Sequence, residues 1–394
     1  MSERIHRISE YGMVIGFLLL TACVLGVSIW RPKEGKSFFE NRSLASVSES
    51  GDFTELEQAL CDNAAFRTTL SMKKAWCDIH LFHRPVVNEI VVTDDSVLLP
   101  YKPYEPVNLP SIRWHSDQIG QQLAALNEQV KSWGGTFLYT AVPCKYAYDA
   151  DLYPSYLYAK EDYNQEANAA FFAALDRYGV PYLDIGEVWT KGEGQPRYLS
   201  SVDHHYTWEG CYTLYRAIME RLISDGGKPL AVLSEDDLSV ETAPNPYLGS
   251  YARKLCRQWT LDEPFRYGVV KENIPFTRYN YGNTTPAKSS LFSFPELWWE
   301  DMTFTAYLGG DLSEMLIETN RPELPSILIF GDSFTNGVET LAYASFDEMR
   351  SLDLRYYKGS LMEYLDAHHP DYVVCIRDYE QLLNRSGNGR IADS

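Results

Sequence analysis

Residues 327–336 read Ile327-Leu-Ile-Phe-Gly-Asp-Ser-Phe-Thr-Asn336. The short apolar run predicts a strand buried on both faces, and it leads directly into a glycine, an aspartate and a serine. In a parallel α/β sheet, active sites lie at the carboxyl ends of strands. Gly331 lets the chain turn sharply there, so Ser333 is expected at the mouth of the crevice, with its N–H toward a developing oxyanion. The alternative is a strand followed by an ordinary helix cap.

Helical and strand patterns alternate along most of the chain. Helices are predicted at 116–133, 164–178 and 211–223, and strands at 136–142, 180–185, 326–330, 353–357 and 372–376. This alternation predicts an α/β fold with a mainly parallel sheet and helices on its faces. Residues 225–300 are rich in Pro, Asn, Tyr and Trp, and we expect them to form an irregular insertion within one domain, residues 51–394.

A second polar cluster, Asp203-His-His-Tyr206, lies far from Ser333 in the sequence. A serine hydroxyl is a weak nucleophile and needs an adjacent base. Imidazole suits that role near neutral pH, and a carboxylate orients the ring and stabilises its charged form. Because an aspartate two positions before a histidine can reach the same ring, Asp203 and His205 are predicted to complete a triad with Ser333.

Two other interpretations of this cluster stay open. His204 and His205 resemble a metal pair with Asp203 as a third ligand, although the remaining histidines form no recognised ligand spacing. Alternatively, Thr207 caps a helix and the histidines pack beside it. We predict neither a metal nor another cofactor.

Residues 11–30 form an uncharged apolar run, YGMVIGFLLLTACVLGVSIW. As a helix this run is about 30 Å long, the thickness of a bilayer's hydrocarbon core, and Tyr11 and Trp30 mark its ends. It predicts a transmembrane anchor, with residues 1–10 as a short cytoplasmic tail and 31–50 as a polar tether. A cleaved signal peptide and a lipoprotein signal around Cys23 are the alternatives.

The charge and residue composition of the chain limit which ligands it is expected to bind. The formal net charge of −19 makes nucleic acid an unlikely ligand. Aromatic residues make up 14% of the chain; they suit sugar rings but also fill cores. The seven cysteines include no Cys-x-x-Cys pair, and both disulfides and free thiols are compatible with their spacing.

Several segments together carry a family resemblance. In chain order they are Glu40-Asn41-Arg42, Asp62 with Phe66-Arg67, Val142-Pro143-x-Lys145, Asp203-His204-His205, Tyr307-Leu-Gly-Gly-Asp311, Gly331-Asp332-Ser333-Phe334, Asp353-Leu-Arg355 and Pro370-Asp371. With them the chain resembles the DHHW family, relatives of the alginate O-acetyltransferase proteins within the SGNH-hydrolase superfamily. Tyr206 stands where the family usually has tryptophan, and the usual SGNH oxyanion blocks are not evident.

The resemblance implies an SGNH-like three-layer α/β/α domain outside the cytoplasm, on a single-pass protein of the cell membrane. It implies an O-acetyltransferase that modifies an exported polysaccharide through an acetyl-serine, with a membrane-bound O-acyltransferase as acetyl supplier. Ser333 is then the nucleophile, His205 the base and Asp203 its partner. The candidates for oxyanion or substrate contacts are Ser333, Asn336, Gly310, Asp311, His204 and Tyr206. A carbohydrate acetyl esterase and a non-catalytic polysaccharide-binding or scaffold protein remain alternatives.

Overall fold

The computed structural model describes residues 2–30, 36–37, 39, 42–45, 51–93, 97–104, 106–157, 161–226, 228–259, 261–287 and 290–391. The chain forms two compact units. Unit 1 comprises Met1–Val92 and Ala252–Thr260, and unit 2 comprises Thr93–Tyr251 and Leu261–Ser394. The sequence predicts one domain over residues 51–394, whereas in the structure residues 51–92 pack with residues 252–260.

Unit 1 opens with helix α1, Ser2–Trp30, which contains the predicted anchor. Its segment Tyr11–Ser28 is long and apolar enough to cross a membrane. Most of the predicted tether, and with it Glu40 and Asn41 of the resemblance, lies outside the described residues. The other elements of this unit are short: β1 Lys36–Ser37, β2 Arg42–Ser43, α2 Phe53–Asp62, α3 Arg67–Trp76, a π-helical turn Cys77–Leu81, β3 Val86–Val87 and β4 Ile90–Val92.

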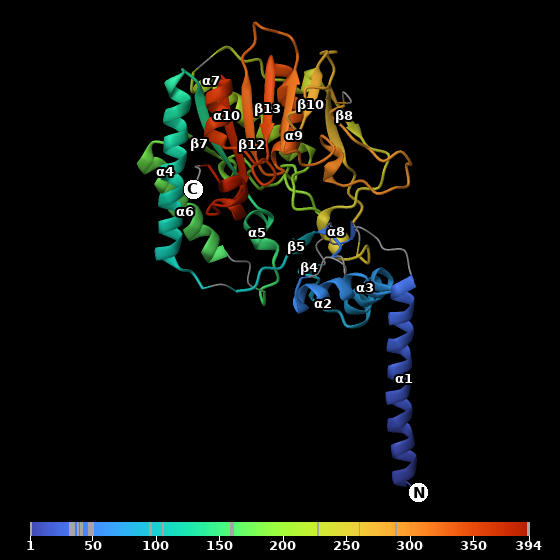
Figure 1. The fold of residues 1–394 in the computed structure, drawn as a ribbon. Helices are drawn as coiled ribbons and strands as arrows, with labels where there is room; N and C mark the ends of the chain where they lie inside the picture. The colour runs from blue at the N-terminus through green and yellow to red at the C-terminus, as the bar shows by residue number, and fades with distance from the viewer. Residues whose placement is uncertain are drawn as a thin grey trace. The chain divides into compact units, whose positions relative to one another are not determined.

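Unit 2 is built on a seven-stranded sheet of order β10-β11-β13-β12-β14-β6-β7, counted over the described residues (Figure 1). The five strands from β13 to β7 are parallel, and β11 and β10 add an antiparallel edge. Their bounds are β6 Thr136–Val142, β7 Tyr182–Asp184, β10 Thr277–Asn280, β11 Glu314–Glu318, β12 Ile327–Gly331, β13 Glu348–Leu352 and β14 Tyr372–Asp378. The mainly parallel sheet is therefore confirmed.

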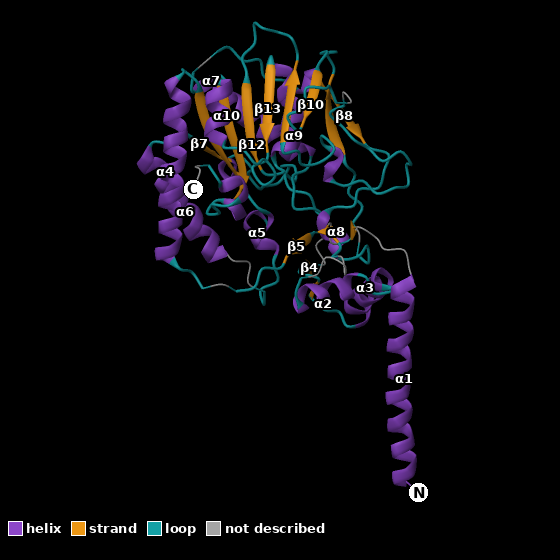
Figure 2. Ribbon diagram, viewed as in Figure 1, coloured by secondary structure: helices purple, strands orange, loops and turns teal. Residues whose placement is uncertain are grey.

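Helices cover both faces of this sheet (Figure 2). Strand β12 shows why: Ile327 and Ile329 face one buried cluster while Leu328 and Phe330 face the other, because successive strand side chains point to opposite faces. One face carries α7 Trp208–Ser224 and α9 Thr335–Ala342, and the other carries α4 Leu109–Ser132, α6 Glu161–Tyr178 and α10 Leu361–His368. This three-layer α/β/α arrangement agrees with the sequence analysis.

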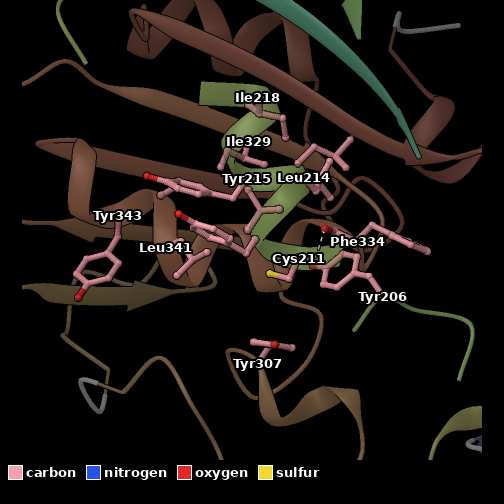
Figure 3. Close-up of a cluster of buried hydrophobic side chains, with 14 of the residues drawn as sticks. Tyr206, Cys211, Leu214, Tyr215, Ile218, Tyr307, Ile329, Phe334, Leu341 and Tyr343 are labelled. Atoms are coloured by element: carbon pink, nitrogen blue, oxygen red, sulfur yellow. Dashed lines mark hydrogen bonds between the residues drawn. The ribbon is translucent and has the colours of Figure 1, made fainter. Parts of the chain in front are cut away.

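Helix α7, which follows the Asp203–Tyr206 segment in the sequence, contributes many side chains to the hydrophobic core. The Thr207 hydroxyl caps it by accepting a hydrogen bond from the N–H of Gly210 at 3.2 Å, as one interpretation of the sequence expected. Leu214, Tyr215 and Ile218 on this helix pack with Ile329 of β12 (Figure 3). Helix α7 is thereby packed against strand β12.

Residues 225–300 consist of loops and short elements: β8 Leu238–Thr242, α8 Ser250–Lys254, β9 Arg266–Val270 and β10, an edge strand of the main sheet. One prediction about local structure is wrong. Residues 353–357 form a turn instead of a strand. The Asp353 carboxylate accepts the N–H of Arg355 at 3.0 Å, a local bond typical of aspartate at turns.

No disulfide joins the cysteines within the part of the chain that the structure describes. The short elements not yet named are β5 Leu98–Pro100 and α5 Lys145–Tyr148, both in unit 2.

Candidate active site

Ser333 stands at the carboxyl end of central strand β12, where the sequence placed it. Gly331 is required here because a Cβ atom would collide with the carbonyl oxygen of Ile376 on the neighbouring strand. The Asp332 carboxylate then shapes the turn. Its Oδ1 accepts the N–H of Phe334 and its Oδ2 accepts the N–H of Asp378, each at 3.0 Å. Asp332 therefore ties the serine loop to β14.

Three predicted side chains meet in one hydrogen-bonded line. His205 Nε2 lies 2.7 Å from Ser333 Oγ, although the two residues are 128 positions apart. His205 Nδ1 lies 2.7 Å from Asp203 Oδ1. These are the nucleophile–base and base–carboxylate distances that acyl-transfer chemistry requires.

The Asp203 carboxylate is held by more than its histidine. Its Oδ1 also accepts the backbone N–H of His205 at 3.1 Å, and its Oδ2 accepts the N–H of Ser250 at 2.6 Å. Asp203 is buried, so these donors replace the water that it loses on folding. The carboxylate is thus fixed as an ion that faces the imidazole.

The His205 ring is also fixed from both sides. Phe304 lies parallel to it, with centroids 3.6 Å apart and an interplanar angle of 4°. The His204 ring lies against it at 3.7 Å. A ring held between two others, with a hydrogen bond at each nitrogen, has one orientation available for proton transfer.

Burial lowers the pKa of His205 to about 4, and the charge of His204 acts in the same direction while Asp203 opposes both. Burial alone would raise the pKa of Asp203, but the charges and hydrogen bonds of His205 and His204 hold it well below its usual range. At neutral pH Asp203 is therefore ionised and His205 neutral. These are the forms that a general base and its partner need.

His204 is 43% exposed and makes different contacts from His205. Its Nδ1 lies 2.8 Å from Ser250 Oγ and 3.1 Å from Asp203 Oδ1. Partial desolvation lowers the pKa of His204, but the charge and hydrogen bond of Asp203 outweigh it, so the pKa is raised. When His204 is protonated, its positive charge disfavours protonation of His205.

This arrangement predicts a pH effect for His204→Gln. Only neutral His205 accepts the serine proton, so the acid limb of kcat/KM for an aryl acetate reports its pKa. Removing the neighbouring charge should raise the pKa of His205, and the acid limb should move to higher pH. His115→Gln, on α4, is the matched control. An acid limb that stays in place or moves to lower pH in His204→Gln would contradict this assignment.

Three predicted oxyanion or substrate residues lie together beside the serine loop. Gly310, Asp311 and Asn336 line one small pocket with Gly331 and Asp332. The amide of Asn336 donates to Asp311 Oδ1 at 3.1 Å, and Arg355 donates to Asp311 Oδ2 at 2.8 Å. In the described part of the chain, the backbone N–H of Ser333 has no acceptor. It is the donor best placed for an oxyanion.

Tyr206 does not belong to the site, contrary to the sequence analysis. Its side chain is buried, where its hydroxyl donates to the carbonyl of Phe334 at 2.9 Å and accepts the N–H of Gly337 at 3.0 Å (Figure 3). It pairs with Leu199 in an antiparallel bridge. In such extended backbone, adjacent side chains point to opposite sides, so Tyr206 faces the core when His205 faces Ser333. Tyr206 therefore braces the serine loop from beneath.

Lys145, Phe304 and Ser250 were missed as site residues. Lys145 is fully buried on α5, and its ammonium donates to the carbonyl oxygens of Ser200 and, at 3.4 Å, Asp203. Burial lowers the pKa of Lys145 to about 7. The Val142-Pro143-x-Lys145 match was the one available signal for this residue. Phe304 and Ser250 reach the triad through tertiary packing alone.

Replacing Lys145 by methionine keeps the length of the side chain but removes its donors to the 200–205 loop. We expect kcat for an aryl acetate to fall by about 10²-fold, because a displacement of about 1 Å costs that much in aligned chemistry. Steady-state kinetics with a thermal-unfolding curve would check this. A kcat within twofold of wild type in a folded Lys145→Met protein would show that the lysine does not position the triad.

The ligand atoms of Asp203, His204 and His205 lie within 4.8 Å of one another, which is compact enough for a metal. However, the Nδ1 atoms of both histidines face Asp203 Oδ1 at hydrogen-bond distance. A ring nitrogen that donates a proton to this oxygen cannot bind a metal at the same time. The contacts therefore fit a hydrogen-bonded triad better than a metal site.

Comparison with known proteins agrees with this fold. Residues 113–294, which include Asp203 and His205, match the family model described as SGNH hydrolase-like domain, acetyltransferase AlgX. No curated protein matches the sequence.

Two solved structures share the fold at low identity. Bacillus cereus PatB1, determined with a sulfonyl adduct, is 20% identical; the match covers 75% of this chain and 96% of that one, with a TM-score of 0.62. A DHHW family protein from Eubacterium siraeum DSM 15702 is 17% identical over 77% of this chain and 95% of that one, with a TM-score of 0.57. The predicted resemblance to the DHHW and alginate O-acetyltransferase proteins is therefore confirmed, and the chain has an SGNH hydrolase-like fold.

Proposed function

We propose that this protein is an O-acetyltransferase that moves acetyl groups onto an exported polysaccharide through an acetyl-Ser333 intermediate. The observation that carries the proposal is the continuous line from Asp203 Oδ1 through His205 to Ser333 Oγ, with both hydrogen bonds at 2.7 Å. The match of residues 113–294 to an acetyltransferase family model supports acetyl as the transferred group.

In the first half-reaction, Ser333 Oγ attacks the acetyl carbonyl carbon while His205 Nε2 takes the hydroxyl proton. Asp203 stabilises the imidazolium, and the Ser333 N–H holds the oxyanion. The tetrahedral adduct collapses, the leaving oxygen takes the proton from His205, and the acetyl group stays on Ser333.

The second half-reaction runs the same chemistry in reverse. A sugar hydroxyl gives its proton to His205 as its oxygen attacks the acetyl-serine. Collapse releases the acetylated sugar and returns the proton to Ser333 Oγ, so the enzyme is regenerated. Water in place of the sugar would give hydrolysis by the same steps.

We propose that Tyr11–Ser28 of α1 spans the membrane and that unit 2 lies outside the cytoplasm at the cell membrane. A membrane-bound O-acyltransferase then supplies acetyl across the bilayer, and the polysaccharide is the acceptor. The span's length and apolar composition support this placement.

The test uses the full-length protein in detergent with an aryl acetate donor and neutral oligosaccharide acceptors. Mass spectrometry should detect acetylated oligosaccharide with wild type and none with Ser333→Ala. Release of acetate by wild type without acetylated sugar would favour an esterase. The absence of both acetate and acetylated sugar, even when the acetyl-supplying membrane protein is co-expressed, would favour the non-catalytic role.

A further inference from the structure

A second pocket lies along the same edge of the sheet as Ser333. It encloses about 750 Å³ of space, part of it open to solvent. Pro143 follows β6, Gly186 and Trp189 follow β7, and Tyr379 follows β14. Parallel strands end at one edge, and Ser333 follows β12 there. At about 4.8 Å per strand spacing, the end of β6 lies roughly 10 Å from the end of β12 in the order β12-β14-β6.

The lining has the chemistry of a neutral, hydroxyl-rich ligand. Tyr148, Trp189 and Tyr379 provide aromatic rings, and three side-chain amides from the first turns of α6 join them: Asn164, Gln165 and Asn168. Aromatic faces pack against the C–H faces of sugar rings, while an amide can donate and accept toward neighbouring hydroxyls. A few convergent polar groups among aromatic walls are typical of a small-molecule site.

Two buried donors in this lining lack partners. Asn164 is 7% exposed and Trp189 is 2% exposed. Neither Asn164 Nδ2 nor Trp189 Nε1 reaches an acceptor within the described ranges of the chain. A buried donor left unpaired costs free energy that a hydroxyl-bearing ligand would recover. The lining residues therefore include two donors that suit a ligand that accepts hydrogen bonds.

Charge favours a neutral ligand over an anionic one. The pocket is lined by one described lysine, Lys191. Its ammonium is paired with the carboxylate of Asp151 and lies 3.7 Å from Asp149 Oδ1. Its ammonium also sits 4.8 Å from the centroid of the Tyr148 ring, which orients that ring. Among the described lining residues an acidic polymer would find no uncompensated positive charge, and it would meet a chain of net charge −19.

We propose that this pocket is an acceptor subsite that binds a sugar unit of a neutral polysaccharide while a neighbouring unit of the same chain reaches Ser333. The inference rests on the proposed transfer to a polysaccharide, and it adds the substrate class and the place where the acceptor is held. A separation of roughly 10 Å at the sheet edge is one that a few linked sugar rings span.

The experiment measures binding in the full-length Ser333→Ala protein, so that no acetyl transfer intervenes. Isothermal titration in detergent would use β-linked oligomers of glucose and of N-acetylglucosamine, with a uronic acid oligomer of equal length as charge control. Tyr148→Ala and Asn168→Ala, each added to Ser333→Ala, should raise the Kd of a bound neutral oligomer by at least about tenfold. The uronic acid oligomer should bind more weakly than the neutral ones.

Tyr281→Ala and Asn283→Ala are the matched controls. Both residues follow β10, which is the outermost strand on the side of the sheet away from β6 and β7. They should leave the Kd within twofold. Asn168 is a half-buried helix residue, so its variant keeps the test open if Tyr148→Ala fails to fold. The subsite is overturned if no oligomer of the panel binds, or if folded pocket variants bind as tightly as the controls.

The two proposals fail separately. If wild type takes no acetyl on Ser333 but the pocket variants lose oligosaccharide binding, the transferase proposal falls and the saccharide site stands. If acetyl-Ser333 forms and the pocket variants bind normally, the site falls and the transferase stands.

Discussion

Ser333→Ala should lower turnover of an aryl acetate by at least about 10⁴-fold, which corresponds to about 5.5 kcal/mol of transition-state stabilisation. The reason is the loss of the hydroxyl oxygen that lies 2.7 Å from His205 Nε2. Alanine removes the hydroxyl without changing the backbone of the turn, which Gly331 and Asp332 fix. Steady-state kinetics on the full-length protein would measure the change.

The matched control is Ser345→Ala. Ser345 is a buried serine whose hydroxyl donates to the carbonyl of Ala231, away from the triad. We expect Ser345→Ala to lower the stability of the fold and to leave kcat close to that of wild type. A residual rate in folded Ser333→Ala within tenfold of wild type would exclude the serine as nucleophile.

Asp203→Asn should lower kcat by about 10⁴-fold. The carboxylate accepts from His205 Nδ1, from the His205 backbone N–H and from the Ser250 N–H. An amide in its place must turn an N–H toward one of these donors, so either the imidazole loses its tautomer or a buried N–H loses its acceptor. The charged imidazolium of the transition state also loses its counter-ion.

Asp62→Asn is the control for this change, because Asp62 is a similarly buried carboxylate, in unit 1, that pairs with Arg67 at 3.7 Å. Its kcat should stay near that of wild type. If both variants lower kcat to a similar degree, the effect of Asp203→Asn is one of general stability and its place in the triad is wrong.

The sequence was most informative where a local pattern is sufficient. The run Ile327–Phe330 is apolar at every position because it faces a buried cluster on each side, and this pattern predicted a central strand. The contact of Asp203 with His205 spans two residues, so it too could be inferred. The meeting of His205 with Ser333 was inferred from the need of a serine for a base and from the family resemblance, since no local pattern joins residues 128 positions apart.

Other features could not be predicted because they depend on tertiary contacts. Phe304 stacks on His205 from a stretch without helical or strand periodicity. Edge strand β10 has the polar sequence Thr277-Arg-Tyr-Asn280, and only its pairing with β11 reveals it. Tyr206 is adjacent to His205 in the sequence, but its side chain does not reach the site. The alternation of extended backbone places it on the other side.

The most direct test is to locate an acetyl group on the protein. The full-length wild-type protein, Ser333→Ala and His205→Gln would each be incubated with an aryl acetate and quenched in acid. Each protein would then be digested, and the masses of its peptides would be measured by mass spectrometry. The account predicts an acetyl group on the wild-type peptide that contains Ser333, none on this peptide in Ser333→Ala, and little in His205→Gln. Acetylation of that peptide at another residue, or equal labelling in all three proteins, would contradict it.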